Sequence, residues 1–344
     1  GRIMAHNIET MAYANAKPWH GLGTEVADTL TPAQMQKAAQ LDWTVSKRPA
    51  YTLDKPEWSS ENGQIVGDVG LLQASGHHFI VRDSDNSVLS QCGEKYIPIQ
   101  NKDIFDFFVK FTQAGHMKME TAGSLRDGKE IWGLAKLKDD FELAGGDEVK
   151  GYLLINQPHE AGKAMTIKFT PIRVVCNNTL TMALRGEGTA LRMPHVKEFD
   201  EDVRAAAEEA LGLSSQAITD FKEKSEFLAS RQYKQESVLN YIAELYQPSV
   251  LVDKAKALTD DEFVMQEQFN TTATQVLQNI DLSPGATMKS AKGTWWGALN
   301  GVTYHEDHQK KQSAPGNALH SSWFGVGANR KAKALDKAIE YANA

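Results

Sequence analysis

The sequence predicts an α+β protein in which an antiparallel, hairpin-rich sheet with packed helices is followed by a mostly helical C-terminal half. Three observations favour this fold class. β-branched and aromatic residues alternate with polar ones in several segments of residues 43–171. Beyond residue 198 the apolar residues recur at helical spacing instead. Nothing resembles repeated βαβ units, which a parallel sheet would require.

The first elements are a short helix, a group of strands and an amphipathic helix. Thr31-Pro32 supplies an N-cap and a first helical residue for a helix over 31–40. Strands are expected at 43–53 and within 76–99, with a turn at 83–86. Asn101 is expected to cap a helix over 102–115 that ends near a glycine.

A second group of strands follows this helix. Residues 118–137 predict a hairpin about Asp127-Gly128, the strongest short-range hairpin signal in the chain. Two further strands are expected at 147–158 and 163–171, joined by a polar turn.

The segment 169–186, FTPIRVVCNNTLTMALRG, predicts a helix with an unusual polar face. Thr170-Pro171 is a plausible start and Gly186 a plausible stop. Four residues spaced by four would form a ridge about 18 Å long that suits phosphates or carboxylates: Arg173, Asn177, Thr181 and Arg185. The alternative is that these arginines are solvated or paired with acids elsewhere.

Helical patterns occupy most of the remaining chain, at 201–230, 236–246, 259–280, 294–309 and 328–342. We therefore divide the chain into an N-terminal arm (1–30), an α+β core (31–197) and a helical C-terminal region (198–344). Residues 1–3 precede Met4 and resemble an expression remnant.

Composition indicates a cytoplasmic protein with segregated charge. The two cysteines, Cys92 and Cys176, indicate a reducing compartment, and no apolar run is long enough to span a membrane. The net charge is −7, yet residues 161–197 hold six bases and one acid, and 308–335 hold five bases and no acid. Residues 198–270 hold sixteen acids and seven bases, which leaves room for a basic face on an acidic protein.

No sequence motif indicates an enzyme. Neither GxSxG nor a P-loop occurs, so we expect no catalytic residue and no cofactor. The HEDH stretch supplies weak metal-ligand candidates in His305, Asp307 and His308, against the alternative of a solvated helix end. Glycines before Arg330 and Lys331 could instead let a helix start bind a phosphate.

Anion binding is the chemistry that the residues favour. The bases expected to line a groove beside the sheet come from the hairpin and from the segment after it: Arg126, Lys129, Lys136, Lys138, Lys163, Lys168, Arg173 and Arg185. Asn177 would fix the register of the bound strand, and Trp295 or Trp296 would stack on unpaired bases. Such binding would be independent of sequence and weakened by salt.

Six motifs in order along the chain resemble those of the phage/plasmid-like family, a domain of unknown function found in phages, prophages and conjugative plasmids: PWHGLG, YIPIQN, ETAGSLRDGKEIWGLAKL, FTPIRVVCNNTLTMALRG, GTWWGALNGVTYHEDH and SSWFGVGANRKAKAL. The resemblance implies a mobile genetic element but no catalytic residues. The order of hairpins and helices is also similar, in architecture only, to the single-strand annealing recombinases of the RecT/Red-beta type, which form rings or filaments.

We therefore expect a single-stranded DNA-binding protein of a phage or plasmid, forming homo-oligomers and assisting strand annealing in recombination. The alternative is an interaction factor that inhibits a host defence or replication protein through its acidic segment 198–270.

Overall fold

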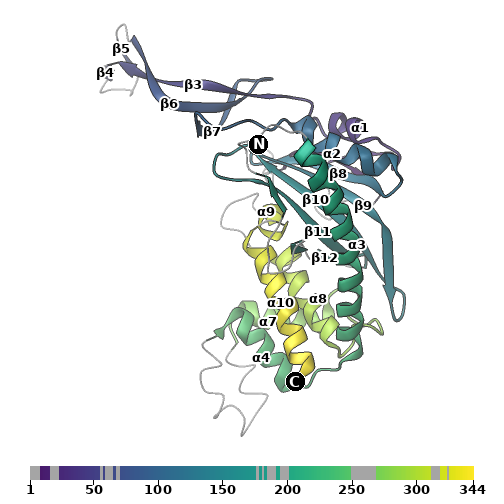
Figure 1. Cartoon of the computed structure of the whole chain (residues 1–344). Coiled ribbons are helices and arrows are strands. Elements are labelled where there is room, and N and C mark those ends of the chain that lie inside the picture. Colours follow the sequence, from purple (N-terminus) through teal and green to yellow (C-terminus); the bar gives the residue numbers. More distant parts are fainter. Residues whose placement is uncertain are drawn as a thin grey trace.

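The computed structural model describes residues 8–15, 23–54, 57–58, 65–66, 70–175, 178–179, 182–183, 191–193, 201–248, 269–310, 318–323 and 325–344. It confirms the predicted α+β class, because antiparallel strands dominate the first half and helices pack together in the second (Figure 1). Within these residues, no helix has the length and apolar character needed to cross a bilayer.

The main sheet has the strand order β12-β11-β10-β9-β8-β1-β2, and β13 and β14 also pair with β11. The strands are β1 Ile8–Ala14, β2 Thr24–Val26, β8 Met117–Leu125, β9 Glu130–Leu143, β10 Asp147–Pro158, β11 Met165–Arg173, β12 Asn178–Thr179, β13 Met182–Ala183 and β14 Leu191–Met193. Strands β8 to β11 form an antiparallel meander. The hairpin at Asp127-Gly128 is confirmed: Leu125 pairs with Glu130, and both turn residues have positive φ.

A smaller sheet projects from the main one as a long arm (Figure 1). It consists of β3 Val45–Asp54, β6 Gly70–Arg82 and β7 Ser87–Gly93, with β6 in the middle, and β4 Glu57–Trp58 pairs with β5 Ile65–Val66 near the tip. At the base of the arm the Arg82 guanidinium donates to Glu9 of β1 at 2.6 Å and to Asp85 at 3.0 and 2.7 Å. The bond to Glu9 ties the arm to the main sheet, and the bonds to Asp85 hold the guanidinium in place within the arm.

Most of the helices cover one face of the main sheet and continue into a bundle, whereas α9 lies on the opposite face. The helices are α1 Pro32–Ala38, α2 Asn101–Gln113, α3 Glu201–Ser230, α4 Gln235–Tyr246, α7 Thr271–Leu282, α8 Trp295–Tyr304, the π-helix η3 His305–Gln309, α9 Ala318–Trp323 and α10 Val326–Asn343. The predicted start of α1 is confirmed by a capping box between Thr31 and Gln34. The Asn101 amide does not cap α2; it donates to the carbonyls of Leu41 and Trp43 instead.

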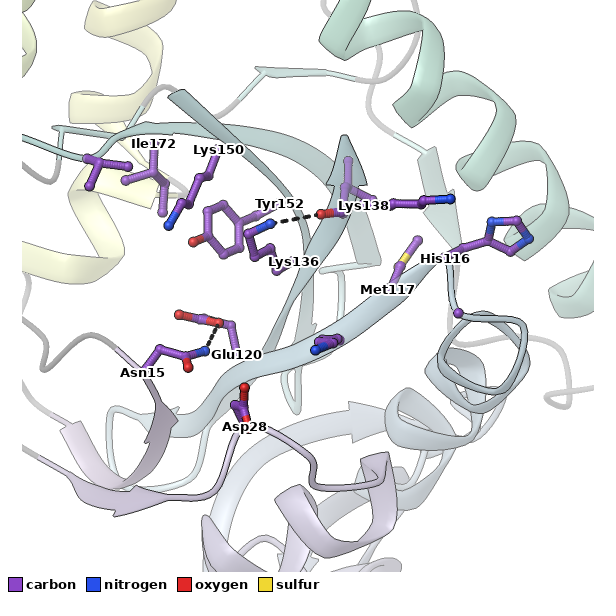
Figure 2. A pocket seen from close by; sticks show the side chains of 14 residues that line it. Asn15, Asp28, His116, Met117, Glu120, Lys136, Lys138, Lys150, Tyr152 and Ile172 are labelled. Carbon is purple, nitrogen blue, oxygen red and sulfur yellow. Dashed lines mark hydrogen bonds between the residues drawn. The ribbon is translucent and has the colours of Figure 1, made fainter. Parts of the chain in front are cut away.

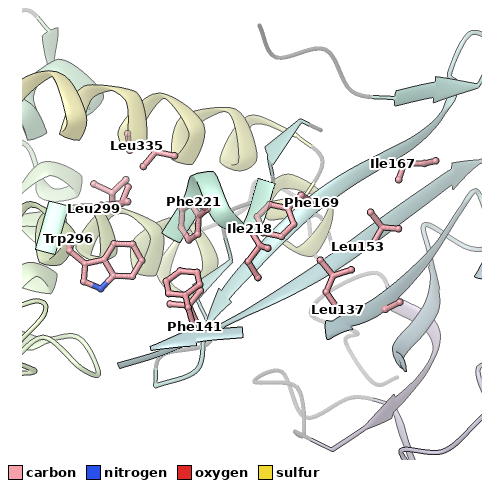
Figure 3. Close-up of a cluster of buried hydrophobic side chains, with 14 of the residues drawn as sticks. Leu137, Phe141, Leu153, Ile167, Phe169, Ile218, Phe221, Trp296, Leu299 and Leu335 are labelled. Atoms are coloured by element: carbon pink, nitrogen blue, oxygen red, sulfur yellow. The ribbon is translucent and has the colours of Figure 1, made fainter. Parts of the chain in front are cut away.

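One apolar core joins the sheet to the helices. Leu153 and Phe169 of the sheet belong to the same buried cluster as Phe221 of α3, Trp296 of α8 and Leu335 of α10 (Figure 3). A second, smaller cluster lies on the opposite face of the sheet, where Trp323 of α9 meets Trp132 edge-on. Part of that opposite face, beyond α9, carries polar side chains instead.

The helix predicted over 170–186 is wrong. Strand β11 continues to Arg173, and the chain then reverses so that Asn178 pairs back with Arg173 and Ala183 with Lys168. Ile172 and Thr179 of this segment are β-branched and also suit a strand. Residues up to Arg173 pair with β10, and the described residues after the reversal pair with β11 itself. Tertiary pairing therefore outweighs the local period in the described residues. Arg173 lies in a strand, and the other members of the predicted ridge, Asn177, Thr181 and Arg185, lie outside the described residues.

Candidate anion-binding pocket

Arg173, predicted to bind phosphate, is a buried structural residue. Only 3% of it is exposed, and its Nε and Nη2 donate to the two carboxylate oxygens of Asp147 at 2.8 and 2.9 Å. Asp147 also accepts from Ser290 Oγ at 2.5 Å and from Trp296 Nε1 at 2.9 Å. A buried charge is stable only when it is paired and hydrogen-bonded, so Arg173 connects the sheet to the helices and does not face a surface ligand.

Trp295 and Trp296, predicted to stack on bases, are core residues. Each is only 2% exposed. The Trp295 ring lies 5.5 Å from the rings of both Tyr241 and Tyr341, and Trp296 lies 6.1 Å from Phe221. Neither indole presents a face to the surface, because helix α8 is buried on all sides.

Two of the predicted cations near the hairpin, Arg126 and Lys163, are paired with the same acid. Arg126 donates to both oxygens of Glu160 at 2.9 and 2.8 Å, and Lys163 donates to the same carboxylate at 2.6 Å. Burial alone would raise the pKa of Glu160, but these hydrogen bonds hold it below its usual range. Lys129 and Lys168 are half-buried. Asn177 and Arg185 lie outside the described residues.

The predicted cations of the C-terminal helix α10 are also paired. Lys331 is fully buried, and its Nζ lies 2.5 Å from Asp307 Oδ1 and 3.0 Å from Ser322 Oγ. Burial lowers the pKa of Lys331. The Arg330 guanidinium lies over the Tyr246 ring at 4.7 Å. These contacts hold α10 against its neighbours and leave Lys331 inaccessible to phosphate.

The HEDH stretch forms the π-helix η3, and its side chains face different partners. His305 Nδ1 lies 3.4 Å from Gln309 Oε1, and the His308 ring lies 4.7 Å from that of Tyr304. Asp307 is bound to Lys331 and Ser322. Among the described residues, no group of three or more His, Cys, Asp or Glu side chains is placed to hold a metal.

A pocket of about 450 Å³ lies on the main sheet (Figure 2). Four lysines line it, of which sequence analysis identified two. Its lysines come from three neighbouring strands: Lys118 from β8, Lys136 and Lys138 from β9, and Lys150 from β10. Lys136 and Lys138 were predicted to line a groove beside the sheet. Sequence analysis did not identify Lys118, Lys150 or Tyr152 as residues of this site.

Strand alternation brings these side chains to one face. Lys118 pairs with Lys136 across β8 and β9, and Lys136 pairs with Tyr152 across β9 and β10. Their neighbours Met117 and Leu137 are buried in the core beneath. Since successive residues of a strand point to opposite faces, the alternation of lysine with apolar residues in MKM (117–119) and KLK (136–138) carried this information.

The charge of the lysines is only partly neutralised. Lys136 Nζ donates to Asp140 at 2.8 Å, and Lys150 Nζ lies 3.5 Å from Glu148. Lys118 and Lys138 are exposed and form no ion pair with any residue that the structure describes. The pocket therefore offers ammonium groups to an incoming anion.

The opposite side of the pocket is acidic. Asn15, Asp28 and Glu120 lie there, across from Lys136, Lys150 and Tyr152 (Figure 2). The Asn15 amide donates to Glu120 Oε2 at 3.1 Å. Burial raises the pKa of Glu120 above its usual range, although the bond from Asn15 and the charges of Lys150 and Lys136 oppose the shift.

Comparisons with known proteins place the chain in a family without supplying an activity. No curated protein and no solved structure matches it. A family model described as a domain of unknown function, DUF932, matches residues 88–340, which include β8 to β11 and most of the pocket. The chain belongs to the DUF932 family.

Proposed function

We propose that the protein binds the phosphate backbone of a single-stranded nucleic acid at the sheet-face pocket. The observation that supports this most is the convergence of four lysines from three adjacent strands. Two of these lysines, Lys118 and Lys138, have no carboxylate partner among the described residues. Ammonium groups that line a pocket release counterions when they bind phosphates, which makes binding strong at low salt and largely independent of sequence.

The shape of the site favours a single strand over a duplex. A pocket of about 450 Å³ is large enough for a nucleotide unit to enter. Duplex DNA is stiff, with a persistence length of about 150 base pairs, and does not bend sharply into a pocket of this size at low cost. A single strand can follow the surface and place one phosphate after another beside the lysines.

We further propose that the protein acts in the cytoplasm for a phage or plasmid, where it would protect single strands or assist their annealing. The motifs shared with the phage/plasmid-like family support this setting. A ring or filament of several copies would place pockets in series along one strand, as the architectural similarity to annealing recombinases suggests.

Fluorescence anisotropy with labelled single-stranded and duplex oligonucleotides at two salt concentrations tests this proposal. The wild type should bind the single strand more tightly, and Lys136→Ala combined with Lys150→Ala should weaken binding and reduce the salt dependence by about one unit of slope per lysine. A matched control replaces Lys222 and Lys292, two exposed lysines outside the pocket, by alanine. Equal losses in both double variants would contradict a specific site.

A second candidate function, protein binding by an interaction factor, is favoured by the arm. Tyr51, Leu71 and Leu72 are 52%, 70% and 56% exposed on its strands β3 and β6. Large apolar side chains in that position are typical of contact surfaces. Replacement of both leucines by serine would abolish capture of a defined host partner from nuclease-treated lysate under this alternative, and would leave oligonucleotide affinity unchanged under the first.

A further inference from the structure

The pocket has one basic side and one acidic side. The basic side suits the phosphate of a bound nucleotide, and the acidic side bears on which base is bound. Lys136 of β9 and Lys150 of β10 lie on one side, and Asn15, Asp28 and Glu120 lie on the other (Figure 2). We infer that Glu120 selects a base with an exocyclic amino group, so that the site prefers cytosine over uracil or thymine at the bound position. This inference rests on the proposed function.

Glu120 is available to accept a hydrogen bond from a ligand. It lies on β8 and is half-buried in the wall of the pocket. Its Oε2 accepts from Asn15 at 3.1 Å, while its Oε1 accepts no hydrogen bond from any residue that the structure describes. Lys136 and Lys150 face it across the pocket without forming an ion pair with it. One oxygen of a held carboxylate is therefore left for a donor.

A carboxylate is a poor component for a site that binds phosphate alone. An ionised carboxylate only accepts hydrogen bonds and repels a phosphate at close range. Its presence opposite the lysines fits a ligand that is anionic at one end and carries N–H donors at the other. A nucleotide unit with an amino-bearing base meets both requirements.

Cytosine and uracil differ at the atoms that Glu120 would contact. Cytosine presents an N4 amino donor, for which Glu and Asp are the usual acceptors. Uracil and thymine present a carbonyl oxygen there, which would face the carboxylate as one acceptor against another. Cytosine would form a hydrogen bond to the charged carboxylate, and uracil would not. The loss of such a bond lowers affinity about tenfold or more.

The test compares 12-nucleotide oligo(dC) and oligo(dU) by fluorescence anisotropy at pH 7.5, since these strands have the same backbone and similar stacking. The wild type should bind oligo(dC) about tenfold more tightly. In Glu120→Gln the preference should be lost or reversed, because an amide can rotate to donate to the uracil carbonyl. The control Glu142→Gln changes an exposed carboxylate of β9 outside the pocket and should keep the preference.

The outcomes separate this inference from the proposed function. Equal binding of the two strands by the wild type would overturn the base preference and leave backbone binding in place. Tighter binding of both strands by Glu120→Gln, by the same factor, would show that Glu120 only repels phosphate and would also overturn the inference. No binding of either strand at low salt would overturn both.

Discussion

Two sets of cations in this protein have opposite surroundings. Arg173 and Lys331 are buried, and each is bound to an acid, Asp147 or Asp307, where sheet and helices meet. Lys118 and Lys138 are exposed beside the pocket and have no ion-pair partner within the described part of the chain. The first set holds the fold together, and the second is available to a ligand. Burial and pairing, more than charge itself, decide between these roles.

Removing the negative charge of Asp147, the partner of buried Arg173, should have the largest effect on stability. Asp147→Asn leaves the Arg173 guanidinium buried without its counter-charge and weakens the bonds from Ser290 and Trp296. Breaking one partner of a buried pair destabilises a protein by about 3–5 kcal/mol. Urea unfolding followed by tryptophan fluorescence measures this loss. A change below about 1 kcal/mol would mean that the Arg173–Asp147 pair does not hold the sheet to the helices.

The pocket lysines that have surface ion pairs should also contribute much less to stability. Lys136→Ala combined with Lys150→Ala removes two partly exposed lysines whose ion pairs lie at the surface. Surface pairs contribute about 0–1 kcal/mol each, so the unfolding midpoint should remain close to that of the wild type. A loss of stability as large as that of Asp147→Asn would show that these lysines help to hold the fold together. The contrast between the buried cations and the pocket lysines would then be wrong.

The smallest effect is expected from the pH dependence of Glu120. Because burial raises its pKa in the folded state, the folded protein binds this proton more tightly than the unfolded chain does. The favourable contribution is complete below the unfolded value, about 4.3, and is lost as pH rises through the folded pKa. Glu120→Gln does not titrate.

Thermal unfolding at pH 7 and pH 4 checks this sign. At pH 7 the variant should be more stable than the wild type, and the difference should shrink toward zero at pH 4. A variant that is less stable than the wild type at pH 7 would show that the ionised carboxylate is favourable in the fold.

The sequence predicted the fold better than the site. The Asp127-Gly128 hairpin and the capping box at Thr31 depend on local chemistry, so the structure confirms both. The segment after Thr170 has apolar residues that fit either a helix or a strand, and only its pairing with β10 and then with β11 decides between them. The tryptophans Trp295 and Trp296 likewise carry no local sign of burial, since it depends on the sheet packed against α8.

The partners of the cations could not be predicted for a related reason. Arg173 finds Asp147 26 residues earlier, and Lys331 finds Asp307 24 residues earlier, both through tertiary packing. The lysines of the pocket follow strand alternation, which is a local signal. Lys136 and Lys138 were identified through the hairpin, and the same alternation in β8 and β10 would have added Lys118 and Lys150.

Photo-cross-linking tests most directly whether the pocket lysines, and not the buried cations Arg173 and Lys331, contact a nucleic acid. A single strand with one 5-iododeoxyuridine is irradiated in complex with the full chain, and the adducts are mapped by mass spectrometry. The account predicts adducts in peptides of β8, β9 and β10 that contain residues 115–120, 136–138 and 150–152. Adducts confined to the helices α3, α8 or α10, with none on these strands, would contradict it.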